Sequence, residues 1–313
     1  MPLTVLFAAD PADWPAFQGP LTQALAMAGI DAVLTDHADD PAAVDYIIFS
    51  PGGTIQDFTA YVRAKAVMNL WAGVEKVVGN ATLTQPLTRM VDPAMTDSMV
   101  EYVTGHVLRH HLGSDRWIQG TKGDWPGNIA VTPLARERQV TILGMGELGQ
   151  AAARALIPFG FRLRGWSRTA REVPGVQTFS GDSGLDAALE GAEIVVTLLP
   201  RTPATENTLD ARRLALLAPG AFIINPGRGT LIDDAALLAA LDAGHVAHAT
   251  LDVFRVEPLP PDHPFWHHPG VTVTPHSAAQ TRPDTSSAVI AENIRRGEAG
   301  LSFLYLVDRA RGY

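Results

Sequence analysis

The stretch VTILGMGELG, residues 140–149, decides the fold of this chain. Its first four residues form a short apolar and β-branched run typical of a buried strand, and a helical pattern follows it. Between them lie glycines at 144, 146 and 149. At a strand-to-helix junction such glycines allow a tight turn and the close approach of a pyrophosphate, whose charge is stabilised by the helix N-terminus. The sequence therefore predicts a dinucleotide-binding unit rather than a ligand-free turn. The expected contacts are Gly144, Met145, Gly146, Glu147, Leu148 and Gly149.

The end of the next predicted strand, WSRT at 166–169, indicates which dinucleotide is bound. Sites for NAD commonly place an acidic residue about 20 residues after the glycine loop, where it binds the ribose 2′-hydroxyl. Arg168 stands here instead, and a guanidinium suits a 2′-phosphate. We therefore expect NADP(H) to be preferred and NAD(H) to be possible, with a solvated surface arginine as the alternative. The further expected cofactor contacts are Trp166, Ser167, Arg168, Thr169, Leu199 and Pro200.

Composition limits the classes of protein to consider. Of the 313 residues, 46% are hydrophobic and 18% charged, which is enough apolar material for two cores. No run approaches the roughly 18 apolar residues of a membrane span, and residues 1–10 lack the pattern of a signal peptide. The chain has no cysteine, which excludes disulfides and thiolate chemistry and favours a cytoplasmic protein. A formal net charge of −9 disfavours nucleic acids and anionic membranes as partners.

Strand patterns alternate with helical patterns along the chain, which is typical of parallel α/β architecture. Strands are expected at 4–8, 32–35, 46–49, 67–70, 139–143, 162–166, 194–198, 221–224, 248–252 and 271–274. Helices are expected at 21–28, 97–111, 149–158, 233–243 and 284–296. We expect His110 and His111, at the end of their helix, to be cations that suit its dipole.

The fold class expected is α/β, with two Rossmann-like or flavodoxin-like domains, parallel sheets and an active-site cleft between the domains. Residues 1–97 plus 284–313 would form the substrate-binding domain, and residues 98–283 the NAD(P)-binding domain.

Ionisable residues follow three of the predicted strands at their carboxyl ends. Arg228 lies in NPGRG, Glu257 in DVFRVEP and His276 in TPHSA. Ligands of open parallel sheets bind at this edge, so we expect the three side chains to converge. Each alone has an ordinary interpretation, as a surface arginine, a helix-start carboxylate or a loop histidine. Their occurrence in order behind the glycine loop favours a catalytic set.

The glycine loop and these three segments together resemble the D-isomer-specific 2-hydroxyacid dehydrogenase family over about 140–290, closest to its bacterial glyoxylate/hydroxypyruvate reductase A type. The resemblance implies an oxidoreductase that forms a homodimer. It implies that Asp252 holds the nicotinamide carboxamide, and that a substrate loop binds the substrate carboxylate through its backbone amides. That loop is Trp71, Ala72, Gly73 and Val74, in which Trp71 replaces a smaller residue. Further cofactor contacts implied are Pro226, Gly227, Arg228 and His276.

Hydride transfer to the keto carbon of a 2-keto acid builds negative charge on the keto oxygen, which a general acid must protonate. His276 is the expected acid because imidazole titrates near neutral pH. Glu257 would orient it and stabilise the imidazolium, and Arg228 would bind the keto and carboxylate oxygens. These roles predict an NADPH-preferring reductase of small 2-keto acids such as glyoxylate and hydroxypyruvate.

Other functions remain open at this point. A lactate-type or other 2-hydroxyacid dehydrogenase with a bulkier substrate shares these motifs, and so does a dinucleotide-sensing, corepressor-like binding protein. Trp117 or Trp125 is a candidate to reach a neighbouring active site. The group Asp262, His263, His267 and His268 is interpreted as a surface loop rather than a metal site.

Overall fold

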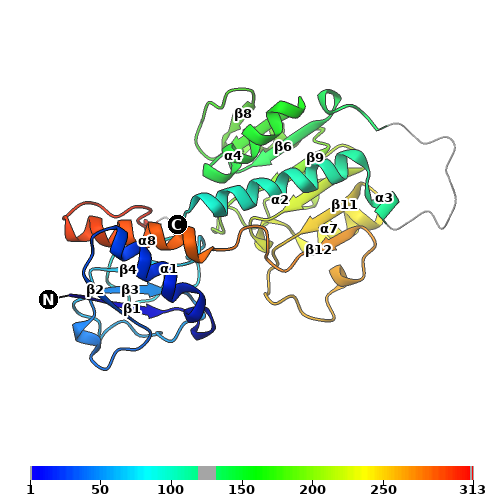
Figure 1. Ribbon diagram of the computed structural model, residues 1–313. Helices are drawn as coiled ribbons and strands as arrows, with labels where there is room; N and C mark the ends of the chain where they lie inside the picture. Colours follow the sequence, from blue (N-terminus) through cyan, green and yellow to red (C-terminus); the bar gives the residue numbers. More distant parts are fainter. Residues whose placement is uncertain (1, 119–131, 311, 313) are drawn as a thin grey trace. The chain divides into compact units, whose positions relative to one another are not determined.

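The computed structural model describes residues 2–118, 132–310 and 312, and it divides into two compact units (Figure 1). Unit 1 comprises Met1–Met95 and Gln280–Tyr313, and unit 2 comprises Thr96–Ala279. Trp125 lies outside the described residues. Within the described residues, no helix has the length and apolar character needed to cross a membrane.

Unit 1 contains a five-stranded parallel sheet in the order β2-β1-β3-β4-β5. Helix α8 (Pro283–Glu298) packs against α1 (Trp14–Met27), so segments from both halves of the sequence build this unit. The strands are β1 (Leu3–Ala8), β2 (Ala32–Thr35), β3 (Tyr46–Phe49), β4 (Ala66–Asn69) and β5 (Leu87–Thr88). Short 3₁₀ helices are η1 (Pro11–Asp13) and η2 (Pro41–Ala43).

Unit 2 contains a seven-stranded parallel sheet in the order β12-β11-β10-β9-β6-β7-β8. The strand order reverses between β6 and β9, and ligands of such sheets bind at the carboxyl ends of the strands beside this point. The strands are β6 (Gln139–Leu143), β7 (Arg162–Ser167), β8 (Gln177–Ser180), β9 (Ile194–Thr197), β10 (Ala221–Asn225), β11 (Val246–Leu251) and β12 (Val271–Val273).

Helices cover both faces of this sheet. Neighbouring residues of β9 belong to different cores: Val195 packs with α5 and α7, and Val196 packs with α2 and α4. A strand buried on both faces explains why the unit's central strands are runs of apolar residues without alternation. The helices are α2 (Pro93–Leu112), α3 (Asp115–Ile118), α4 (Glu147–Leu156), α5 (Gly181–Leu189), α6 (Ala211–Leu214) and α7 (Asp234–Asp242). The 3₁₀ helices are η3 (Ala135–Glu137), η4 (Ile157–Phe159), η5 (Gly229–Leu231) and η6 (Pro264–Trp266).

The two parallel α/β units confirm the predicted fold class. The prediction that His110 and His111 act as cationic helix caps is wrong. Both side chains are buried, and burial lowers the pKa of each. The His110 ring stacks on Phe222 at 4.8 Å, so it serves as a neutral core residue.

Candidate active site

The glycine loop lies at the carboxyl end of β6, where the sheet reverses. Gly144 has a φ of 109°, and a Cβ there would lie 2.6 Å from the Leu198 carbonyl oxygen. A Cβ on Gly149 would lie 1.9 Å from the Gly144 carbonyl oxygen. Gly146 precedes α4, and a Cβ there would meet nothing within 4 Å. Packing thus requires glycine at 144 and 149, whereas the space over Gly146 at a helix N-terminus fits the pyrophosphate of a dinucleotide.

Other predicted cofactor residues lie in different environments. Met145 is fully buried, and the Trp166 indole packs in the core and donates to the Gly181 carbonyl at 2.8 Å. These two side chains support the fold, so only their backbone could face a ligand. Arg168, by contrast, is exposed just beyond the end of β7. The remaining predicted contacts are placed as follows: Leu148 packs partly on the core, Leu199 is buried, Ser167 donates to the Thr169 carbonyl, and the Pro200 carbonyl accepts from Thr205.

Arg228 lies in a loop whose backbone is hydrogen-bonded to the buried Asn225. Asn225, at the end of β10, donates to the Arg228 carbonyl at 3.0 Å and accepts from the Thr197 hydroxyl at 2.6 Å. Its Oδ1 also accepts from the Gly227 amide at 3.2 Å. Asn225 was not among the sequence candidates, although it opens the NPGRG segment that was. Its position as the last residue of a buried strand is the signal that identifies it.

Glu257 and His276 form a hydrogen-bonded pair. His276 Nδ1 lies 2.9 Å from Glu257 Oε2, and Glu257 Oε1 accepts from the Phe254 amide at 2.9 Å. His276 has a φ of 52°, in the left-handed region that non-glycine residues adopt rarely and often at functional sites. The structure therefore joins two of the three predicted catalytic residues directly, and both sit on loops at the same sheet edge as Arg228.

The electrostatics of Glu257 favour its charged form. Burial raises the pKa of this carboxyl, but the hydrogen bonds from His276 and Phe254, and the charges of His276 and Arg228, outweigh it and leave the pKa lowered. Glu257 is thus an anion that can stabilise an imidazolium on His276.

Asp252 is fully buried between these loops. Its Oδ1 accepts from the Thr274 hydroxyl at 2.6 Å and from the Ser277 amide at 2.8 Å, and its Oδ2 accepts from the Ala278 amide at 3.0 Å. Thr274 in turn contacts the Tyr102 hydroxyl at 2.8 Å. Asp252 therefore fastens the loop that carries His276, a function that sequence reasoning did not assign to it.

The predicted substrate loop belongs to unit 1. The Asn69 amide, at the end of β4, donates to the carbonyls of Trp71 and Gly73, each at 2.9 Å. The Trp71 ring is 42% exposed and lies under the Lys76 ammonium at 5.6 Å. Val74 is buried, whereas Ala72 and Gly73 are partly exposed. How this loop approaches the residues of unit 2 stays a prediction.

No group of three or more potential metal-ligating side chains occurs in the described parts of the chain. His263 and His268, of the cluster noted in the sequence, instead lie near the carboxylates of Asp234 and Asp242.

Residues 103–278 match the family model described as D-isomer specific 2-hydroxyacid dehydrogenase, NAD binding domain. The chain belongs to this family. It is 40% identical over 261 residues to a glyoxylate/hydroxypyruvate reductase A of Yersinia enterocolitica, which covers 80% of this chain and 82% of that protein. The predicted family and the prediction of an NAD(P)-dependent oxidoreductase are confirmed.

Solved structures agree over the whole chain. A D-isomer specific 2-hydroxyacid dehydrogenase from Xanthobacter autotrophicus, in complex with NADPH and MES, superposes with a TM-score of 0.90 at 40% identity and covers 100% of both chains. An NADPH-dependent glyoxylate/hydroxypyruvate reductase from Sinorhizobium meliloti, in complex with NADP and sulfate, gives a TM-score of 0.84 at 33% identity, covering 99% of this chain and 100% of that one.

Proposed function

We propose that this protein is an NADPH-preferring reductase of small 2-keto acids, with glyoxylate and hydroxypyruvate as its substrates and His276 as the general acid. The observation that carries the proposal is the His276–Glu257 pair at 2.9 Å. With Nδ1 bonded to a carboxylate, the Nε2 atom of the imidazole becomes the one that exchanges a proton with a substrate. The relatives named glyoxylate/hydroxypyruvate reductase support the substrate class.

Each group has a separate task in this scheme. The cofactor supplies a hydride to the keto carbon when bound. His276 Nε2 donates a proton to the keto oxygen, and the Glu257 anion stabilises the imidazolium before the transfer. Arg228 offers its guanidinium donors to the keto and carboxylate oxygens, which orients the acid and polarises the carbonyl. Unit 1 would act as the substrate-binding domain through the amides of residues 71–74.

Arg168 supports the preference for NADPH. Its exposed guanidinium stands at the end of β7, the position where an acidic residue would bind the 2′-hydroxyl of NAD. Relatives in complex with NADPH and NADP support the same choice.

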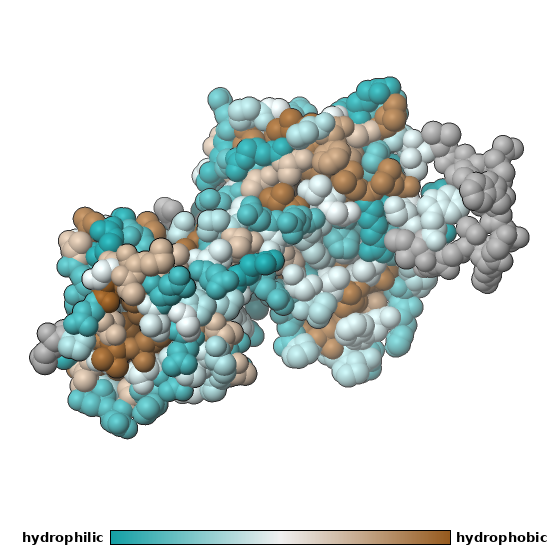
Figure 2. Space-filling view, viewed as in Figure 1, coloured by the Kyte–Doolittle hydropathy of each residue, from teal (hydrophilic) through white to brown (hydrophobic). Residues whose placement is uncertain are grey.

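We also propose that the protein forms a homodimer through unit 2. Leu112, at the end of α2, is 54% exposed, and Phe159 in η4 is 47% exposed. The two rings between them, His111 and Phe161, are buried and link the two segments: His111 contacts Phe161 at 5.0 Å, and Phe161 contacts Phe159 at 6.3 Å. Figure 2 shows apolar side chains gathered on unit 2 around the C-terminal end of α2. An exposed apolar area of this kind marks a protein contact.

The experiment that tests the activity follows NADPH oxidation by purified protein with glyoxylate, hydroxypyruvate and pyruvate, with NADH as the comparison. Turnover of the first two with NADPH is expected, and His276→Gln should lower kcat at least about 100-fold. Preference for pyruvate would instead assign a lactate-type enzyme. Tight NADPH binding with no turnover of any 2-keto acid would favour the dinucleotide-sensing, corepressor-like function.

A further inference from the structure

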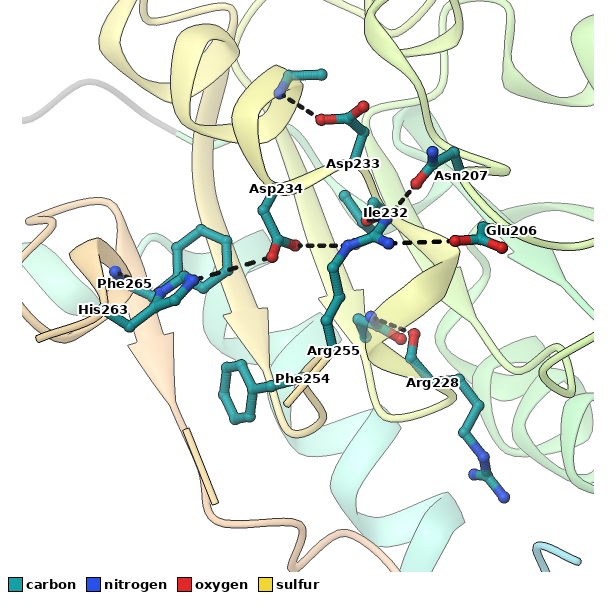
Figure 3. Close-up of polar contacts among 12 residues, drawn as sticks. Glu206, Asn207, Arg228, Ile232, Asp233, Asp234, Phe254, Arg255, His263 and Phe265 are labelled. Carbon is teal, nitrogen blue, oxygen red and sulfur yellow. Dashed lines mark hydrogen bonds and ion pairs between the residues drawn. The ribbon is translucent and has the colours of Figure 1, made fainter. Parts of the chain in front are cut away.

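Arg255 occupies the centre of a polar cluster beside the candidate active site (Figure 3). It lies in the loop after β11, between Asp252 and Glu257, but its side chain extends away from Arg228. Its Nη2 atom donates to the Ile232 carbonyl at 2.6 Å and to the Asn207 side-chain oxygen. The proposed reaction gives this side chain no task.

Two carboxylates complete the cluster at longer range. Arg255 Nη1 lies 3.5 Å from Glu206, and Nε lies 3.6 Å from Asp234. Glu206 is 58% exposed, so this ion pair contributes little stability. The hydrogen bonds to Ile232 and Asn207, together with the less exposed Asp234, therefore fix the guanidinium, because its planar fork sets the direction of the hydrogen bonds as well as their length.

The segments that Arg255 binds are continuous with the Arg228 loop. Ile232 donates to the Gly229 carbonyl, and Asn207 donates to the Thr230 carbonyl, at 3.3 and 2.9 Å. A Cβ on Gly229 would lie 2.0 Å from the Phe254 carbonyl carbon, so the two loop backbones are in direct contact. Arg255 thus clamps the loop that carries Glu257 onto the segment that immediately follows Arg228.

The clamp acts on the pair of residues that would handle the proton. The Phe254 amide, next to Arg255, donates to Glu257 Oε1, and Glu257 Oε2 bonds His276. We propose that Arg255 is a positioning residue that holds the Arg228 and Glu257 loops in register, and so sets the geometry of the Glu257–His276 hydrogen bond. This inference rests on the proposed function for its kinetic consequence only, because the hydrogen bond itself can be observed without turnover.

The test compares Arg255→Met, which keeps length but removes the donors, with Arg255→Lys, which keeps the charge but loses the fork. The matched control is Arg212→Met, which removes a bidentate pair with Asp186 that lies in a different part of the unit. The readouts are kcat with glyoxylate, the Kd for NADP+ by fluorescence, and the downfield proton resonance of His276 Nδ1–H, assigned by its loss in His276→Gln.

Arg255→Met should lower kcat about tenfold and weaken or abolish the Nδ1–H resonance, with the NADP+ Kd within about twofold and Arg255→Lys intermediate. Arg212→Met should change none of these. An unchanged resonance and kcat in Arg255→Met would overturn the proposal. If Arg255→Met does not fold, Asn207→Gly serves in its place, because it removes the amide oxygen while suiting the φ of 50° at that position. If the wild type reduces no 2-keto acid, the proposed function fails, and the resonance alone still decides the role of Arg255.

Discussion

Asp252 accepts a 2.6 Å hydrogen bond from the hydroxyl of Thr274, although the two residues belong to different strand ends of the sheet. The same carboxylate accepts from the amides of Ser277 and Ala278. His276 lies between these donors, so its left-handed backbone conformation is held by the buried Asp252 side chain of the neighbouring loop. The family resemblance implies that Asp252 contacts the nicotinamide. Its hydrogen bonds show that it also supports the loop that carries His276.

Replacement of Asp252 by Asn should therefore damage both stability and turnover. The amide retains one acceptor oxygen, so at least one of the Ser277 and Ala278 amides loses its partner inside the protein. We expect the free energy of unfolding to fall by about 1–3 kcal/mol and kcat to fall with it. Urea unfolding and NADPH oxidation measure the two effects. Thr274→Val removes one donor to Asp252 and the partner of the Tyr102 hydroxyl but leaves the Ser277 and Ala278 amides paired, so it should show a smaller loss. An equal loss in both variants would contradict the assignment.

The glycines of the 144–149 loop should separate stability from ligand binding. Gly149→Ala places a Cβ 1.9 Å from the Gly144 carbonyl oxygen and should lower the melting temperature. Gly146→Ala meets no protein atom within 4 Å, so it should leave the melting temperature unchanged but weaken NADPH binding at least about tenfold. Calorimetry with and without NADPH measures both. Unaltered NADPH affinity in Gly146→Ala would place the pyrophosphate elsewhere.

Arg168→Ala should raise the KM for NADPH about tenfold and leave the KM for NADH within about twofold, because only NADPH carries the 2′-phosphate. Steady-state kinetics with each cofactor give the comparison. Arg171→Ala, at another exposed arginine of the same loop, is the control and should alter neither constant. Equal changes for both cofactors would remove Arg168 from the 2′-phosphate site.

Two histidines of α2, His110 (buried) and His106 (partly buried), should make stability depend on acid pH. Burial is the main cause that lowers the pKa of His106 to about 4 and that of His110 to about 2, from the ordinary value of 6.5. Below pH 6.5 the unfolded chain binds protons that the folded chain does not. The free energy of unfolding should thus fall as the pH drops from 6.5 toward 4, by up to about 1.4 kcal/mol per pH unit for each proton. Above pH 6.5 these two histidines should contribute no pH dependence.

Urea titrations at several pH values measure this slope. His110→Gln should reduce it, although the variant is less stable at neutral pH. His37→Gln, at an exposed histidine, should keep it. A slope that persists unchanged in both His110→Gln and His106→Gln would point to other groups as the source, either His111, whose pKa burial also lowers, or carboxylates.

Phe159→Glu should convert the proposed dimer to a monomer, because it places a charge in the apolar area that continues to Leu112. Light scattering after gel filtration gives the mass. Val62→Glu, at a 75% exposed residue of unit 1, is the control and should leave the mass unchanged. A wild type that is already monomeric would end the proposal.

The sequence predicted the strands that contain a clear run of apolar residues and missed those that contain no such run. β2, β3 and β6 begin and end where expected, because each is a short run in which apolar residues predominate, and such runs have few alternatives. β8 and α5 were not predicted: three of the four residues of β8 are polar, and glycine and serine occur in the first turn of α5. Their existence depends on pairing with β7 and packing on the core, which local sequence does not record.

The candidate site shows the same division. Arg228, Glu257 and His276 could be found because charged groups that follow buried strands need an explanation. Thr274 and Arg255 could not, because their partners are 22 and 23 residues away and only the folded chain brings them together. The glycine loop was predictable as a motif. Only the packing shows that a Cβ has space at Gly146 and none at Gly144 or Gly149.

The packing of α8 on α1 sets an order of events during synthesis. A ribosome adds every residue of unit 2 after it has made α1 and before it makes α8. The N-terminal part of unit 1 therefore emerges with the side of α1 that packs on α8 uncovered, and that side stays uncovered while the continuous 96–279 segment is made and folds as a unit. Until translation delivers α8, this face of α1 is an apolar surface that a chaperone can bind.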